Sequence, residues 1–235
     1  MGAIFKREFK SFFNSSVGYV ILAMFIGFSA YFFTGTCFLY DRTVNMKNTF
    51  LNMFFILLFL TPILTMKSFS EERRQRTDQA LLTAPVSLIE IVMGKYLSAM
   101  ALYTACCAVF PVYGFILTFY GTPQWSVIFC STLGFVLLGA TLIAIDMFIS
   151  SLTESQIISA ILGMAVGLFV YLLPSITATI KVDWVAKGLK TLTFSEYFQS
   201  FTYGLLDPSG IVFFLSITGL FIFLTARVLE KRRWS

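Results

Sequence analysis

Six long apolar stretches dominate this chain of 235 residues and restrict what it can fold into. They cover about residues 17–40, 50–66, 96–120, 125–150, 157–174 and 210–226. A helix needs about 20 apolar residues to cross the hydrocarbon core of a bilayer, so stretches of this length suit membrane spans. They are continuous rather than alternating with period two, which favours helices over a β-barrel. The sequence therefore predicts an all-α polytopic membrane protein, with six spans in a single domain over residues 1–235.

The basic residues are unevenly distributed over the loops between these stretches. Twelve Lys and Arg residues lie in the N-terminal segment, the loop after the second stretch up to Lys95, and the C-terminal tail, against five in the loops on the other side. The side with the excess is expected to face the cytoplasm. We therefore expect both termini in the cytoplasm. The net charge of +5 reflects this topology and does not indicate binding to nucleic acid.

Several kinds of chemistry are excluded by the residue types that the chain contains. It has no histidine, which rules out a histidine base, a Ser-His-Asp triad and a histidine-ligated metal. Its cysteines all lie in apolar stretches without metal-ligand spacing, at Cys37, Cys106, Cys107 and Cys130. The pair Gly94-Lys95 lacks the upstream glycine of a phosphate-binding loop. We therefore expect no catalytic residue, metal site or cofactor in this chain.

The segment from residue 2 to 14 has the pattern of an amphipathic helix. Its phenylalanines follow the spacing i, i+4, i+7 and i+8, and its lysines fall on another face. These residues are Phe5, Phe9, Phe12, Phe13, Lys6 and Lys10. Such a helix suits the headgroup region of an anionic leaflet. The alternative is an irregular basic leader that only sets the orientation of the chain.

A highly charged segment, residues 67–85, separates the second and third stretches. Ser70 can cap a helix whose first turn holds Glu71 and Glu72, and Pro85 would end it. The charged residues available to a partner are Glu71, Glu72, Arg73, Arg74, Arg76 and Asp78, and Leu81, Leu82 and Pro85 could add an apolar anchor. From the residue pattern alone, a docking helix over 70–85 and a solvated loop that only enforces topology are equally supported.

Ionisable residues inside the predicted spans are sparse, and the fifth span carries a ridge of small residues. Asp146 is the only ionisable residue well inside a predicted span, where it could pair helices, reach toward the membrane surface, or take part in gating. Ser159, Gly163 and Gly167 form a ridge of small residues, suited either to packing within the chain or to contact with a second subunit. The segment 175–209 mixes aromatic and polar residues, which predicts short amphipathic helices that re-enter or lie on the membrane.

These features together resemble the permeases of ABC-2 type transporters. The similarity is carried by Ser70-Glu71-Glu72-Arg73-Arg74, by the run from Thr77 to Ser87, and by Ile91-Val92-Met93-Gly94-Lys95. It extends to Ser150-Ser151-Leu152-Thr153-Glu154 and Arg232-Arg233-Trp234, and so covers essentially the whole chain. Within the family, the chain is most similar to the gliding-motility-like permeases found in many bacteria.

The resemblance implies an export permease of the bacterial plasma membrane, working with separate ATPase subunits that bind ATP and Mg. Segment 70–85 would be the coupling helix that seats in the ATPase, and 175–209 would hold re-entrant helices near the outer mouth. Two permeases, identical or different, and two ATPases would form the working unit, with an extracytoplasmic auxiliary protein as a possible addition. The alternative is a membrane anchor or sensor that recruits an ATPase without transporting. A membrane-embedded enzyme has little support, because no span carries a cluster of polar groups.

Overall fold

The computed structural model describes residues 2–40, 45–74, 87–179, 191 and 193–233, and the elements among them are helices. In chain order these are α1 (Gly2–Asn14), α2 (Ser16–Thr34), the π-helix η1 (Gly35–Tyr40), α3 (Lys47–Thr65), α4 (Ser70–Arg74), α6 (Leu88–Cys107), α7 (Val109–Leu117), α8 (Trp125–Leu152), α9 (Gln156–Thr179), α11 (Phe194–Thr202) and α12 (Pro208–Arg233). The predicted all-α fold class is confirmed.

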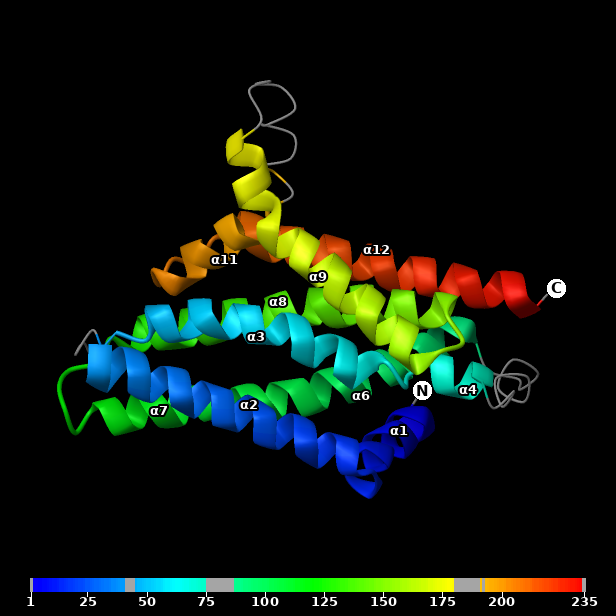
Figure 1. The fold of residues 1–235 in the computed structure, drawn as a ribbon, viewed down its shortest axis with the longest axis horizontal. Helices are drawn as coiled ribbons and strands as arrows, with labels where there is room; N and C mark the ends of the chain where they lie inside the picture. The colour runs from blue at the N-terminus through cyan, green and yellow to red at the C-terminus, as the bar shows by residue number, and fades with distance from the viewer. Residues whose placement is uncertain (1, 41–44, 75–86, 180–190, 192, 234–235) are drawn as a thin grey trace.

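Within the described residues, six helical stretches are long and apolar enough to cross a membrane. They are Ser16–Leu39, Lys47–Arg74, Leu88–Leu117, Trp125–Leu152, Gln156–Thr177 and Pro208–Arg233. Figure 1 shows that both chain termini lie at the same end of the bundle as α4. We call this the α4 end; it holds α1, α4, the start of α6 and the C-terminal ends of α8 and α12. The chain is a multi-pass membrane protein.

Helix α8 is the central element of the bundle. It packs against α3, α6, α9, α11 and α12, and every residue from Leu138 to Met147 is buried. Two glycines allow this close packing. A Cβ atom on Gly139 would lie 2.3 Å from the ring of Tyr103 in α6, and one on Gly134 would lie 2.5 Å from the Phe201 side chain in α11. Small residues in a span let neighbouring helices approach closely, which explains why α8 can be surrounded.

Aromatic rings fill the space around α8. The ring of Phe110 lies 4.5 Å from that of Phe50, 5.3 Å from that of Phe135 and 5.9 Å from that of Phe25, measured between centroids. All four residues are fully buried; the contacts of Phe110 with Phe25 and Phe135 are edge-to-face, a favourable arrangement, and that with Phe50 is tilted. Large apolar side chains elsewhere are exposed on the outer faces of α2, α9 and α12. A bilayer solvates such faces, so they fit the predicted membrane location.

The helices extend beyond several predicted span boundaries. Helix α6 begins at Leu88 rather than at 96, and α12 continues through the basic tail to Arg233. The prediction ended each span at the first charged residues, but a helix keeps its backbone hydrogen bonds outside the hydrocarbon core. Charged side chains near its ends can then reach water or each other. Helix α9 likewise continues through Pro174 to Thr179.

The prolines act locally, without ending the spans. Pro111 has no N–H to donate to the carbonyl of Cys107, four residues earlier, and the α-helical assignment is interrupted between Cys107 and Val109. Pro62 lies inside α3, which continues to Thr65, and the Pro62 carbonyl accepts the N–H of Met66 at 2.8 Å as in a regular helix. The second span therefore passes the proline, where the sequence allowed a kink or an early stop.

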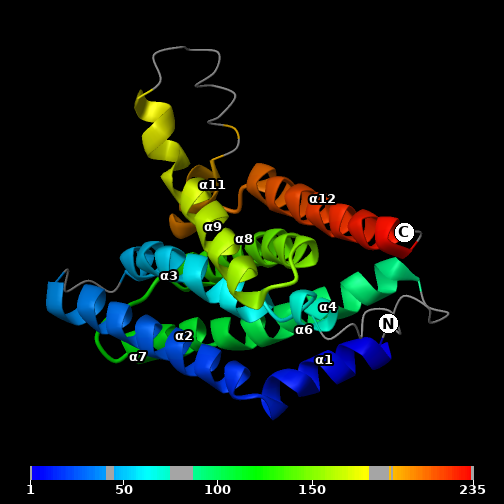
Figure 2. The same ribbon diagram turned by 45° about the vertical axis from the view of Figure 1, so that its right-hand side comes forward.

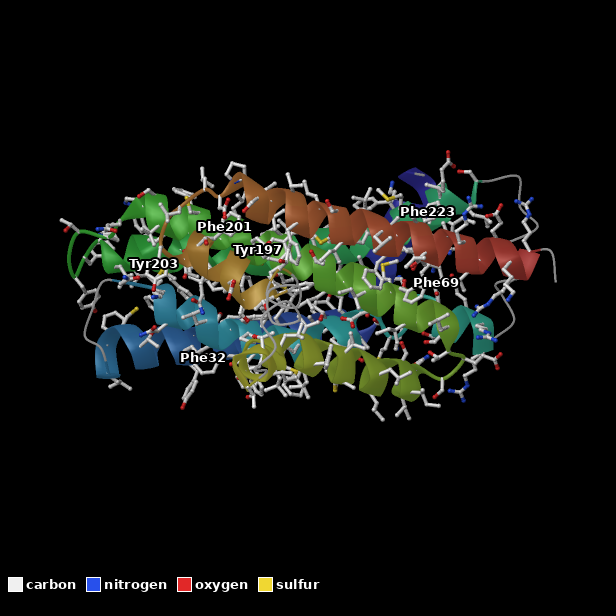
Figure 3. The ribbon with its side chains drawn as sticks, turned by 90° about the horizontal axis from the view of Figure 1, so that it is seen from above. Phe32, Phe69, Tyr197, Phe201, Tyr203 and Phe223 are labelled. Atoms are coloured by element: carbon white, nitrogen blue, oxygen red, sulfur yellow. The ribbon has the colours of Figure 1, made fainter. Side chains whose placement is uncertain are left out.

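Helix α11 is the described part of the segment between spans five and six. Its buried face, Phe194, Phe198 and Phe201, packs against the bundle, and the Ser131 hydroxyl of α8 donates to the Phe201 carbonyl at 3.3 Å. Beside it, the ammonium of Lys47 lies 3.7 Å from the centre of the Tyr203 ring, away from the α4 end (Figure 3). Residues 180–190 and 192 lie outside the described residues, and a re-entrant arrangement of 175–209 stays a prediction.

Candidate functional site at the α4 end

Helix α4 is fixed to the bundle through backbone groups at its start. The hydroxyl of Ser150 in α8 accepts the N–H groups of Phe69 and Ser70, each at 3.3 Å. Ser70 is fully buried, and its own hydroxyl donates back to the Met66 carbonyl. The sequence predicted Ser70 as a cap for the helix that follows. Instead, tight turns join α3 directly to α4, so Ser70 connects α4 to the preceding helix and to α8.

Lys95 of α6 joins α4 to α1. Its side chain is only 2% exposed, and its ammonium donates to the carbonyl of Ser68 at 2.8 Å and to the carboxylate of Glu72 at 2.8 Å. The carboxylate of Glu8 in α1 lies 3.4 Å from the same nitrogen. The ring of Phe69 lies 5.3 Å from it, so the cation is also screened from water on that side. The buried ammonium of Lys95 therefore connects α1, α4 and α6.

Arg7 of α1 completes this arrangement. Its guanidinium lies 2.8 Å from the Glu8 carboxylate and 3.4 Å from that of Glu72. The hydrogen bond with Glu8 is the main reason that the pKa of Arg7 is raised above its usual value, although partial burial lowers it and the charge of Glu72 adds to the rise. We call Arg7, Glu8, Glu72 and Lys95 the ion network. It connects α1, α4 and α6 by charge-assisted hydrogen bonds.

Two arginines bind the C-terminal end of α8. The Arg73 guanidinium donates to the Leu152 carbonyl at 3.0 Å and pairs with Glu154 at 2.7 Å. Arg232 of α12 donates to the carbonyl of Ser151. The last carbonyls of a helix have no partner inside the helix and carry the negative end of its dipole, so cations are favourable there. Arg73 thus links α4 to the connection between α8 and α9, and Arg232 links α12 to the same place.

Helix α1 lies against α2 and α6 because two glycines make room for it. A Cβ atom on Gly18 would lie 2.3 Å from the carbonyl oxygen of Phe12, and one on Gly94 would lie 2.9 Å from the Ile4 side chain. Figure 2 shows α1 next to α6 at the α4 end. The rings of Phe5, Phe9 and Phe13 stack in sequence along one face, with Phe5 and Phe9 5.7 Å apart and Phe9 and Phe13 5.2 Å apart between centroids.

The remaining side chains predicted for this region lie as follows. Lys6 and Lys10 are exposed, and Phe12 and Phe13 pack partly against the core. Glu71 is half-buried, whereas Arg74 is exposed at the end of α4. Arg76, Asp78, Leu81, Leu82 and Pro85 lie outside the described residues, so of the predicted coupling helix the structure describes only 70–74, and its role stays a prediction.

Asp146 and the ridge of small residues meet at one helix crossing, away from the ion network. Asp146 is only 4% exposed, and its Oδ2 atom has no hydrogen-bond partner among the described residues. A Cβ atom on Gly163 would lie 2.7 Å from Asp146 Oδ1 and 2.9 Å from Pro62, and one on Gly167 would lie 3.4 Å from Leu58. Gly163 and Gly167 therefore face α3 and α8 of the same chain, and Ser159 is buried on the same helix.

Sequence reasoning did not identify several residues that make the principal contacts here. Lys95 was counted only among the basic residues that set the topology, and Arg7, Glu8, Ser150 and Glu154 had no assigned role. A signal was present, because a lysine follows the apolar run Ile91-Val92-Met93 after a single glycine and needs a partner wherever that run is buried. Several segments that carry the family resemblance contact one another or lie together at the α4 end. They are 70–74, 94–95, 150–154 and residue 232.

Comparison with known proteins agrees with this arrangement. The model of the family described as "ABC-2 family transporter protein" matches residues 3–231, which is nearly the whole chain and covers five of the span-length helices and all but the last two residues of the sixth. No curated protein matches the sequence. Within the described residues, no group of three or more His, Cys, Asp or Glu side chains could hold a metal ion. The chain belongs to the ABC-2 family of transporter proteins.

Proposed function

We propose that this chain is the permease subunit of an ABC exporter, and that a separate ATPase subunit docks at the α4 end. ATP and Mg would bind in the ATPase, and two permeases with two ATPases would form the transporter. The α4 end would then face the cytoplasm of a bacterial cell, which the excess of basic residues in its loops supports. Placement in the gliding-motility-like subgroup rests on motif similarity.

The observation that carries this proposal is the set of polar contacts that radiate from α4. Glu72 binds Lys95 of α6 and lies next to Arg7 of α1, while Arg73 binds the end of α8 and Glu154 before α9. A force applied to α4 would therefore reach four other elements without passing through a flexible loop. A protein that only anchored an ATPase would need the exposed surface of α4 but not these connections. This distinction favours a permease over an anchor or sensor.

The exposed end of α4 offers a direct test. We expect Arg74→Glu to reduce recovery of the co-expressed ATPase about tenfold, because a reversed charge at an interface opposes its partner. The melting temperature should stay unchanged, since Arg74 is exposed. The measurement is the ratio of ATPase to permease after affinity purification through the permease. The matched control is Lys231→Glu, an exposed basic residue near the end of α12.

The two charge reversals separate docking from a general charge effect. Loss of the ATPase with Arg74→Glu but not with Lys231→Glu would support docking at α4. Equal recovery with both variants would count against it. Transport into vesicles by the reconstituted complex, or an ATPase rate that responds to a candidate substrate, would then separate a permease from an anchor.

A further inference from the structure

A cavity of about 500 Å³ lies between α1, the end of α3, α4 and α6. This volume is within the usual range for small-molecule sites. Its walls are of two kinds. Phe12, Val17 and Leu64 supply apolar surface, and serines from three segments, including Ser11 and Ser68, supply hydroxyl groups. The cavity is therefore amphiphilic, with room for a ligand that has both polar and apolar parts.

The charged groups of the cavity balance one another. Arg7, Lys67 and Lys95 face it together with Glu8, Glu71 and Glu72, so its walls carry equal numbers of cations and carboxylates. Lys95 already has three oxygen partners, whereas Lys67 forms no ion pair with the described residues. The Arg7 side chain is 56% exposed. Two cations are thus available for a phosphate, and a carboxylate such as Glu71 can accept a further donor through its several lone pairs.

The position of the cavity indicates where such a ligand comes from. Val17 lies in the first turn of the first span and Leu64 near the end of α3, so the apolar wall lies where two spans end. Helix α1 forms another wall through Arg7, Glu8, Ser11 and Phe12. An amphipathic helix of this kind lies at the level of the lipid headgroups. The cavity therefore opens at the depth where phosphate groups of the bilayer are found.

We propose that this cavity binds the headgroup of a zwitterionic aminophospholipid of the surrounding bilayer. The phosphate lies at Arg7 and Lys67, and the ammonium lies at Glu71. Because the three cations and three carboxylates of the wall balance, a lipid whose phosphate is balanced by its own ammonium keeps the site neutral, whereas an anionic lipid adds a negative charge with no cation to balance it. This lipid would sit between α1 and α4. Binding of this lipid goes beyond the proposed function and does not depend on an ATPase.

Native mass spectrometry of the purified full chain tests this proposal. The chain is titrated in mild detergent with phosphatidylethanolamine, phosphatidylglycerol or inorganic phosphate. We expect one phosphatidylethanolamine to bind at least several-fold more tightly than phosphatidylglycerol, and phosphate not to displace it. Lys67→Gln should weaken its binding about tenfold, which corresponds to the loss of one charge-assisted contact. Lys10→Gln, an exposed lysine of α1 outside the cavity, is the control and should bind as the wild type does.

Each of the other outcomes would overturn the proposal. Equal binding of the two lipids would exclude a site built for a zwitterion. Displacement by inorganic phosphate would indicate an anion site without lipid specificity. An equal loss of phosphatidylethanolamine binding in the Lys67→Gln and Lys10→Gln variants would place the lipid outside the cavity. A melting temperature within experimental error of the wild type shows that Lys67→Gln is folded, and the absence of ATPase from the assay keeps this result independent of docking.

Discussion

Replacing Lys95 with methionine is expected to lower the free energy of unfolding by about 3 kcal/mol, near the lower end of the cost of breaking a buried ion pair. The ammonium is 2% exposed, but its partners Glu8 and Glu72 are 19% and 20% exposed, so water partly screens the charges that remain. Methionine keeps the length and the apolar stem of the side chain. The loss therefore comes from two neighbouring carboxylates without their shared cation. The free energy of unfolding is measured by unfolding the purified, detergent-solubilised protein with a denaturant.

A second substitution shows whether the ion network is the cause. In the double variant Lys95→Met with Glu72→Gln, one of the two carboxylates that lost the ammonium becomes neutral, which leaves Arg7 to balance Glu8 alone, and we expect at least half of the lost stability to return. The control is Lys6→Met, which removes an exposed lysine of α1 and should change stability by less than about 0.5 kcal/mol. If Lys95→Met were as stable as the wild type, the network would not hold α1, α4 and α6 together.

The second large effect concerns Gly18, at the contact between α1 and α2. Gly18→Ala is expected to lower the free energy of unfolding by about 2 kcal/mol, which is in the range for inserting a methyl group into a packed site. The new Cβ would lie 2.3 Å from the carbonyl oxygen of Phe12, a backbone atom that cannot move without shifting the end of α1. Hydrogen exchange should therefore become faster in α1, and the melting temperature should fall.

Gly27 provides the matched control for this prediction. It lies in the same helix α2, and a Cβ atom there would meet nothing within 4 Å. Gly27→Ala should be neutral or slightly stabilising, because alanine favours a helix more than glycine does. Similar losses in both variants would show that α2 itself, rather than the seating of α1, is sensitive to the change.

The parts of the fold that follow from periodicity were predictable from the sequence. Continuous apolar stretches indicated six spans, and the spacing of Phe5, Phe9, Phe12 and Phe13 indicated a helix before the first of them. The boundaries were less accurate because hydropathy falls at the first charged residue. Helix α12 does not end there, since Arg227 pairs with Glu230 of the same helix and Arg232 binds the end of α8 while the backbone stays hydrogen-bonded.

The contacts of the candidate site could not be derived in the same way. Glu8, Glu72 and Lys95 lie far apart in the sequence, and no periodic pattern encodes which helices become neighbours. The sequence showed that Gly163 and Gly167 make a smooth face, but only the packing of α9 on α3 and α8 shows what that face contacts. Ser70 is a similar case. A serine at this position predicted an N-cap for the helix that follows, but the structure shows that its backbone N–H donates to Ser150, which is 80 residues away.

The central claim is that an ATPase docks at the α4 end and that this end faces the cytoplasm. The most direct measurement is photo-crosslinking in cells that co-express the chain with its ATPase, with a photoreactive residue at Arg74 or at Thr122. Both positions are exposed, and Thr122 lies in the turn between α7 and α8 at the opposite end (Figure 1). The account predicts a covalent adduct with the ATPase from position 74 and none from 122. An adduct from 122, or none from 74 while the ATPase still co-purifies, would contradict it.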